Sequence, residues 1–287
     1  MLPPSTTIGP VSLFVPDLER SILFYEDVLG FKTHLHEGDT AELGAPDGTV
    51  LLELIERPTF VRPSRHNPGL FHFAILFPTR ADLGRSLIHL SESEWKLSGA
   101  GDHLVSEALY LDDPDGNGIE LYADRPSETW EYQDGLVQMD TLAVDMESLI
   151  AAGREDESPW HGIPDGTKMG HVHLKVSDLE ATGEFYRNLL GFALMAKMPQ
   201  ALFVSVGGYH HHIGLNTWMS ENYEDAPADS LGLKGFTINV PTQADLDVIE
   251  AKLIDTGTIL DFTDLTPFLR DPSGIGIWIK VQPELGV

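Results

Sequence analysis

The sequence predicts an α+β protein made of four modules, each with the strand and helix order βαβββ. Three observations support this prediction: a helical segment that occurs twice, a strand-and-helix segment that occurs twice, and an Asp-Pro turn that follows each copy of the second segment. An internal repeat determines the architecture of the whole chain.

The helical repeat relates the two halves of the chain. The segment PDLERSILFYEDVLGF at 16–31 recurs as SDLEATGEFYRNLLGF at 177–192, and the same Asp, Phe, Tyr and Gly positions return. The second repeat is weaker, and it matches GLFHFAILFPTRADL from Gly69 to GLKGFTINVPTQADL from Gly232. The modules are therefore of two types, which alternate along the chain.

Each module begins with a short apolar strand and continues with an amphipathic helix. Apolar residues of the first helix recur at a spacing of three or four, which is typical of one buried helix face; they are Leu18, Ile22, Tyr25 and Leu29. Three strands separated by Gly, Asp and Pro turns follow the helix. The Asp-Pro turns of the second and fourth modules lie at 113–119 and 271–277.

The repeats set the boundaries of the modules. The four modules cover about 8–58, 68–126, 168–219 and 231–283. A single curved sheet of about four strands cannot bury both of its faces, so we expect the modules to pair into two half-barrel cups. The predicted organisation is thus 1–126 for modules one and two, a linker at 127–167, and 168–287 for modules three and four.

Composition excludes several classes of function. The 287 residues carry a formal charge of −27, which opposes binding to nucleic acid or to an anionic membrane. The chain has no Cys, so a metal ion would need His, Asp or Glu ligands. No apolar run approaches the roughly 18 residues of a membrane span, and the N-terminus does not resemble a signal peptide. We therefore expect a cytoplasmic protein.

The repeated pattern resembles the vicinal oxygen chelate superfamily, which includes glyoxalase I, fosfomycin-resistance proteins and extradiol dioxygenases. The segments GDHLVSEALYLDDPDGNGIELYADRP and GGYHHHIGLNTW are more closely similar to its bacterial catechol-2,3-dioxygenase branch. The resemblance implies a cup-shaped site whose ligands project from the first and last strands of two paired modules.

The residues at those strand positions differ between the modules. On the first strands, modules one to four carry Pro10, His72, His171 and Gly235. On the last strands, the matched residues are Leu52, Glu120, His212 and Trp278. Because the residues that can bind a metal lie in modules two and three, we predict that these two modules form the metal cup. Pairing of consecutive modules would instead divide the set between two cups.

The resemblance then implies chemistry for this set. His72, His171 and Glu120 form a 2-His-1-carboxylate triad, which leaves open positions on iron(II); manganese, zinc or nickel are less favoured alternatives. The implied substrates are a small aromatic diol of the catechol type and O₂, and the implied reaction is extradiol ring cleavage. His212 is the candidate acid/base, since an imidazole has an ordinary pKa near about 6.5.

Several alternatives stay open at this point. His171 and His173 share one strand face, so either can be the ligand, and the other then lines the substrate pocket. Alternation along a strand would point His210 toward the pocket together with His212. A glyoxalase I-like isomerase or thiol transferase would use His212 as a fourth ligand, but only one carboxylate occupies the four positions. A non-enzymatic binding protein is the third possibility, and a homodimer is expected.

The remaining conspicuous residues have structural interpretations. Tyr25 and Tyr186 lie on the core faces of the repeated helices and are expected to be packing residues. The Asp113 turn lacks the distal Glu of a calcium loop, so we interpret it as a turn that orients Glu120. Among the His residues without a matched position, His103 is the best candidate for a role in the site.

Overall fold

The computed structural model describes residues 2–155, 160–258, 261–263 and 266–282. Residues 156–159 of the predicted linker, and residues 259–260, 264–265 and 283 of the fourth module, lie outside this range. The described residues contain four successive βαβββ modules. The predicted α+β fold class is confirmed.

The elements of modules one and two follow the predicted order. Module one comprises β1 (Thr7–Val15), α1 (Leu18–Asp27), β2 (Lys32–Glu37), β3 (Thr40–Gly44) and β4 (Val50–Glu56). Module two comprises β5 (Gly69–Leu76), α2 (Arg80–Glu92), β6 (Gly99–Asp102), β7 (Ser106–Asp112) and β8 (Gly118–Asp124).

Modules three and four repeat the same order. Module three comprises β11 (Lys168–Lys175), α4 (Leu179–Glu184), the π-helical turn η2 (Phe185–Leu190), β12 (Ala193–Met198), β13 (Ala201–Ser205) and β14 (Ile213–Asn216). Module four comprises β15 (Gly232–Val240), α5 (Gln243–Asp255), β16 (Asp261–Thr263), β17 (Thr266–Arg270) and β18 (Gly276–Val281). The single helix expected at 177–192 thus changes from α to π geometry halfway along.

The strands form two large sheets. One has the order β12-β13-β14-β11-β5-β8-β7-β6, and the other has the order β16-β17-β18-β15-β1-β4-β3-β2. In modules two, three and four the first and last strands pair in parallel, and the last strand pairs antiparallel with the strand before it. By contacts the chain forms two compact units, 1–13 with 60–71 and 171–287, and 14–59 with 72–170.

Side-chain caps begin the repeated helices. The carboxylate of Asp17 accepts a hydrogen bond from the Arg20 N–H at the start of α1, and Asp178 caps α4 in the same way. Thr79 and Thr242 cap α2 and α5 through their hydroxyl groups. The helix starts that the sequence repeat predicts are therefore set by local hydrogen bonds.

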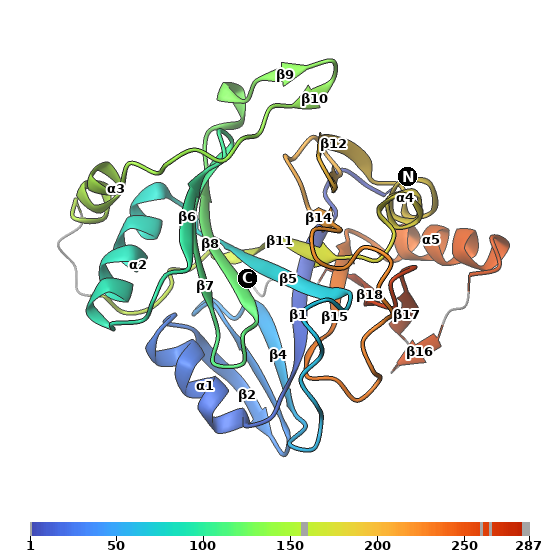
Figure 1. The fold of residues 1–287 in the computed structure, drawn as a ribbon, viewed down its shortest axis with the longest axis horizontal. Helices are drawn as coiled ribbons and strands as arrows, with labels where there is room; N and C mark the ends of the chain where they lie inside the picture. The colour runs from blue at the N-terminus through green and yellow to red at the C-terminus, as the bar shows by residue number, and fades with distance from the viewer. Residues whose placement is uncertain (1, 156–159, 259–260, 264–265, 283–287) are drawn as a thin grey trace. The chain divides into compact units, whose positions relative to one another are not determined.

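The predicted linker contains secondary structure. It includes the two-stranded hairpin β9 (Tyr132–Gln133) and β10 (Leu136–Val137), and the helix α3 (Met146–Gly153). Figure 1 shows α3 beside α2. A Cβ atom at Gly84 would lie 2.3 Å from the Leu149 carbonyl oxygen, so only glycine permits this approach of the two helices.

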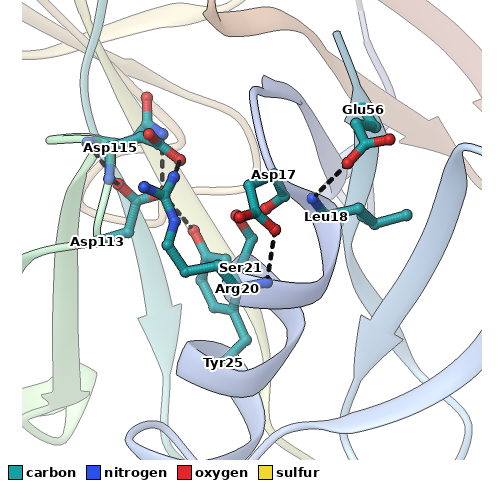
Figure 2. Close-up of polar contacts among 9 residues, drawn as sticks. Asp17, Leu18, Arg20, Ser21, Tyr25, Glu56, Asp113 and Asp115 are labelled. Carbon is teal, nitrogen blue, oxygen red and sulfur yellow. Dashed lines mark hydrogen bonds and ion pairs between the residues drawn. The ribbon is translucent and has the colours of Figure 1, made fainter. Parts of the chain in front are cut away.

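Each repeated helix also binds the Asp-Pro turn of the module that follows it. The Tyr25 hydroxyl of α1 donates a hydrogen bond of 2.9 Å to Asp113, as Figure 2 shows. In the other unit, the Tyr186 hydroxyl donates to Asp271 at 3.1 Å. Both Tyr side chains are fully buried, as expected for packing residues, but each also serves as a hydrogen-bond donor.

None of the helices in the described part of the chain is long and apolar enough to cross a membrane.

The pH dependence of stability is predicted to report on Asp271. Burial raises the pKa of Asp271 from 3.8 to about 6, against hydrogen bonds that lower it. The folded chain thus holds this proton more tightly than the unfolded chain. The resulting stabilisation is complete below about pH 4 and is lost as the pH rises through 6. Two pKa units correspond to about 3 kcal/mol.

Urea unfolding of the metal-free wild type and of Asp271→Asn, at several values between about pH 4 and 7.5, measures this effect. The free energy of unfolding of the wild type relative to the variant should fall as the pH rises through 6. A difference that does not change with pH would contradict the prediction.

Candidate active site

The first part of the candidate site lies in module two. Glu120 is central in β8, and β8 pairs in parallel with β5, so that Glu120 lies opposite Ala74. His72 precedes Ala74 by two residues on β5 and therefore shares its face of the sheet. His72 Nε2 lies 3.0 Å from Glu120 Oε2, and both side chains are buried. A buried imidazole and a buried carboxylate thus converge on one point.

Tyr110 lies beside these two residues. It faces Glu120 across the β7–β8 pair, and its ring centroid is 5.6 Å from that of His72. Burial raises the pKa of Tyr110 well above its ordinary value of 10.0, and the Glu120 charge raises it further. The phenol therefore keeps its proton at neutral pH and is a hydrogen-bond donor.

His103 supports Tyr110 from the other side. Its Nε2 lies 2.6 Å from the Tyr110 hydroxyl, and its Nδ1 lies 2.9 Å from the Asp140 carbonyl oxygen. Because a carbonyl oxygen only accepts, Nδ1 carries the proton and a neutral ring accepts from Tyr110 at Nε2. His103, the best candidate among the unmatched His residues, thus contacts a residue adjacent to Glu120.

The second part of the candidate site lies in module three. His171 and His173 are both buried on one face of β11. The ring centroid of His171 is 4.0 Å from that of His211 and 6.3 Å from that of His210. His171 is therefore surrounded by imidazoles on this side, whereas the surroundings of His173 are different.

Aromatic rings enclose His173. Its ring centroid lies within 5.1–5.6 Å of those of Phe71, Phe203 and Trp218, each in an edge arrangement. Its Nε2 accepts a hydrogen bond of 3.0 Å from the Asn216 amide. The Asn216 amide is oriented in turn by the backbone N–H of Trp218, which donates to Asn216 Oδ1. These contacts fix the orientation of the His173 ring.

The segment Tyr209–His212 does not have the geometry that strand alternation predicts. β14 begins only at Ile213, and His210, His211 and His212 lie in the preceding loop, where Gly207 has a φ of +65° and Gly208 of +80°. All three His side chains are buried. Alternation holds only within a strand, so it does not decide which way the His210 and His211 side chains point relative to His212.

The three His side chains have distinct partners. The Nδ1 atoms of His210 and His211 are 2.7 Å apart, so one of them donates to the other. His212 Nδ1 lies 2.7 Å from the Ser205 hydroxyl and also accepts from the Val206 N–H at 3.4 Å. Side-chain hydrogen bonds thus orient these imidazoles, while the backbone of His212 also bonds to Val172 and Val204 of the neighbouring strands.

The matching of His212 with Glu120 also requires correction. In module two, Glu120 pairs with Ala74, which follows His72 by two residues. In module three, the residue that follows His171 by two is His173, and it pairs with Gly214. Gly214 is therefore the counterpart of Glu120 in module three, and His212 lies two positions earlier. In module four the same position holds Trp278, which pairs with Thr237, as the sequence predicts.

The donor chemistry of these residues fits a metal ion. Among the residues that the structure describes, the set of His and acidic side chains that could hold one is His72, Glu120 and His171, all three buried. Two imidazoles and one carboxylate suit iron(II) and also accept manganese or zinc. A buried carboxylate is costly unless a cation or hydrogen bonds compensate its charge.

A family profile matches most of the chain. The profile of the Glyoxalase/Bleomycin resistance protein/Dioxygenase superfamily matches residues 7–121 and 168–279. The chain belongs to this superfamily. The family resemblance inferred from the repeats is thereby confirmed, and the two matched segments correspond to the two pairs of successive modules.

Individual relatives in the superfamily are dioxygenases. The chain is 44% identical over 271 residues to a catechol-2,3-dioxygenase of Bacillus subtilis (strain 168), covering 93% of this chain and 94% of the relative. It is 37% identical over 156 residues to a biphenyl-2,3-diol 1,2-dioxygenase 3 of Rhodococcus globerulus, covering 53% of this chain and 75% of the relative. These matches support the prediction that the chain is a dioxygenase enzyme.

A solved structure supports the fold independently. A putative dioxygenase from Bacillus subtilis superposes with a TM-score of 0.68 at 13% identity, and the superposition covers 97% of this chain and 86% of the other. At this identity the similarity concerns the fold alone.

Sequence reasoning missed several residues of the site. Tyr110 and His211 were not singled out, and neither were the aromatic rings around His173. Tyr110 could have been found, because it lies across from Glu120 in a hairpin whose turn is visible in the sequence. The position of His211 could not, since the loop that carries it follows no periodic pattern.

Substituting Gly214 is predicted to disturb the second part of the site. A Cβ atom there would lie 2.9 Å from two ring carbons of His173, which is closer than real contacts allow. Gly214→Ala should therefore displace the His173 ring and lower the free energy of unfolding by about 1–3 kcal/mol.

Gly99→Ala is the matched control, because a Cβ atom at that strand glycine would meet its nearest neighbour, in Tyr110, at 3.9 Å. Thermal and urea unfolding of both variants make the comparison. Equal stability of the two variants would contradict the predicted clash.

Proposed function

We propose that the chain is an extradiol ring-cleaving dioxygenase, which opens a catechol-type ring with O₂ at a mononuclear iron(II) ion. The observation that carries the proposal is the buried set of His72, Glu120 and His171, which supplies two imidazoles and one carboxylate. His72 lies on β5 and His171 on β11, which are neighbours in the strand order of one sheet. The identity to a catechol-2,3-dioxygenase over most of the chain supports the same reaction.

The proposed metal ligands leave room for both substrates. Iron(II) held by three protein ligands would supply open positions for the two oxygens of the diol and for O₂. His171 is preferred over His173 as the ligand from β11, because Asn216 and three aromatic rings already hold His173. His173 and His210 are proposed to line the substrate pocket.

His212 is proposed to take a proton from the diol and return it later in the reaction. The Ser205 hydroxyl lies 2.7 Å from His212 Nδ1 and 3.3 Å from the Val206 carbonyl oxygen. It can therefore donate to Nδ1, which also accepts from the Val206 N–H. With Nδ1 accepting, a neutral His212 ring carries its proton on Nε2, which is the nitrogen proposed to exchange a proton with the diol.

Tyr110 is proposed to be a neutral phenol beside Glu120 whose proton is donated to His103. Its raised pKa keeps the hydroxyl group protonated, and His103 holds its orientation.

Oxygen consumption tests the proposed reaction. The protein is loaded anaerobically with iron(II) and then mixed with catechol, methylcatechols or hydroquinone in air. Extradiol cleavage should consume one O₂ per ring and give a yellow ring-opened semialdehyde from catechol. An iron-loaded protein that leaves all these diols unchanged would exclude the proposal, and turnover of a hemithioacetal without O₂ would favour an isomerase instead.

Substitution of the three proposed ligands is predicted to remove metal and activity together. His72→Ala, Glu120→Gln and His171→Ala should each leave less than one iron per chain, measured by metal analysis after anaerobic dialysis. His173→Ala is the control from the same strand as His171, and it should retain iron. Loss of iron in His173→Ala but not in His171→Ala would reverse the assignment of the two residues.

Substitution of His212 is predicted to separate chemistry from metal binding. His212→Gln should retain iron but lower kcat by about 10²- to 10⁴-fold, the range for removing a general acid/base. Ser205→Ala should have a smaller effect in the same direction. If His212→Gln lost its iron, His212 would be a metal ligand rather than the acid/base.

A cytoplasmic location and a homodimeric state stay predictions. Size-exclusion chromatography with light scattering measures the second directly.

A further inference from the structure

The Asp-Pro turn between β7 and β8 is organised around a single buried carboxylate. Asp113 Oδ1 accepts hydrogen bonds of 2.8 Å from the N–H groups of Asp115 and Asn117. Its Oδ2 accepts from the Asn117 amide at 2.8 Å and from the Tyr25 hydroxyl at 2.9 Å. Four donors thus converge on one side chain, and one of them comes from α1 of the preceding module.

This turn determines which face of β8 carries Glu120. The β7–β8 hairpin pairs Asp112 with Gly118 and Tyr110 with Glu120, directly beyond the turn. Side chains alternate between the two faces of a strand, so a shift of one residue in this pairing would move Glu120 to the opposite face. The hydrogen bonds to Asp113 resist such a shift.

The other unit contains the same arrangement without a metal-binding residue. Asp271 accepts from the N–H groups of Ser273 and Ile275 and from the Tyr186 hydroxyl. The following hairpin has the same pairing, but Trp278 occupies the position of Glu120. The Asp271 turn therefore serves as a control within the same chain for the effect of the Asp113 turn on Glu120.

The turn beside Glu120 has two additional polar contacts. Arg20 Nη2 of α1 contacts Asp115 Oδ2 at 2.6 Å, whereas Ala181 and Ser273 occupy the corresponding positions in the other unit. The Asn117 amide binds Asp113, whereas the corresponding residue is Ile275. Figure 2 shows Arg20 and Tyr25 extending from α1 toward the turn. In the counterpart turn the Ser273 hydroxyl instead accepts from the Ser177 backbone N–H and lies 3.5 Å from the Thr182 hydroxyl.

We propose that Tyr25, with Arg20, is a positioning residue for metal binding: it holds the Asp113 turn so that Glu120 keeps the geometry of a metal ligand. The inference rests on the proposed role of Glu120 in the metal site. Tyr25 touches neither Glu120 nor His72, and it acts only through the turn. Groups that orient a metal ligand typically contribute about 10- to 100-fold to metal affinity.

The test compares Tyr25→Phe with Tyr186→Phe. Each substitution removes one buried hydroxyl that donates to a buried Asp, so both should lower Tm by similar amounts. The affinity for iron(II), measured by anaerobic equilibrium dialysis of the full chain with the metal alone, should fall about 10- to 100-fold in Tyr25→Phe. It should change by less than about twofold in Tyr186→Phe, because no ligand follows that turn.

Variants that copy the counterpart turn provide a second measurement. Arg20→Ala and Asn117→Ile introduce the residues that the other unit already carries at these positions, so the fold should tolerate them. Their double variant should also weaken iron(II) binding, even if Tyr25→Phe does not fold. Unchanged affinity in the double variant and in a folded Tyr25→Phe would overturn the inference.

Glu120→Gln distinguishes failure of this inference from failure of the proposed function. If Glu120→Gln binds iron(II) as the wild type does, Glu120 is not a ligand and the proposed function fails. If Glu120→Gln loses iron but Tyr25→Phe and Tyr186→Phe behave alike, the proposed function stands and the positioning role is wrong.

Discussion

The geometry around Glu120 depends on the hydrogen bonds that the buried Asp113 carboxylate accepts. A carboxylate inside a protein is unfavourable unless donors compensate it, and Asp113 collects donors from its own turn and from α1. Even so, burial still raises the pKa of Asp113 above 3.8. The donors offset the cost of burying this charge only in the conformation of the turn that brings them to Asp113. That conformation sets the pairing of β8 with β7.

The same principle explains the difference between the two turns. Asp271 lacks the amide donor that Asn117 gives to Asp113, and burial raises its pKa to about 6. Both turns thus have the same backbone hydrogen bonds to the carboxylate, but only Asp113 also accepts from a side-chain amide. The better compensated turn is the one that precedes Glu120.

Equivalent strand positions of the modules carry residues of different chemistry, although the strands pair in the same way. The position of Glu120 is held by Gly214 in module three and by Trp278 in module four, and the strand pairing is the same in all three modules. In module three the missing side chain leaves space for His173, while His210, His211 and His212 enter from the loop before β14. The imidazoles at and around His171 therefore come from two sources: from strands, where spacing is regular, and from the loop before β14, which places His210 and His211 beside His171.

The sequence by itself determined the four modules and their order, and it predicted the donor set His72, Glu120 and His171 while leaving His173 as an alternative to His171. It could do so because helix and strand periodicity, turn residues and internal repetition are local properties of the chain. Helix starts at Asp17 and Asp178 followed from capping, which is equally local.

Only the tertiary structure decided the partners of these residues. The pairing of β11 with β14 shows that Gly214, and not His212, corresponds to Glu120. The sequence does not reveal this pairing, because the loop between β13 and β14 follows no regular spacing. The contacts of Tyr110 with His103, and of Tyr25 with Asp113, join residues from different elements. Periodicity identifies the face on which a side chain lies, but its partner is fixed only when the strands pair and the helices pack.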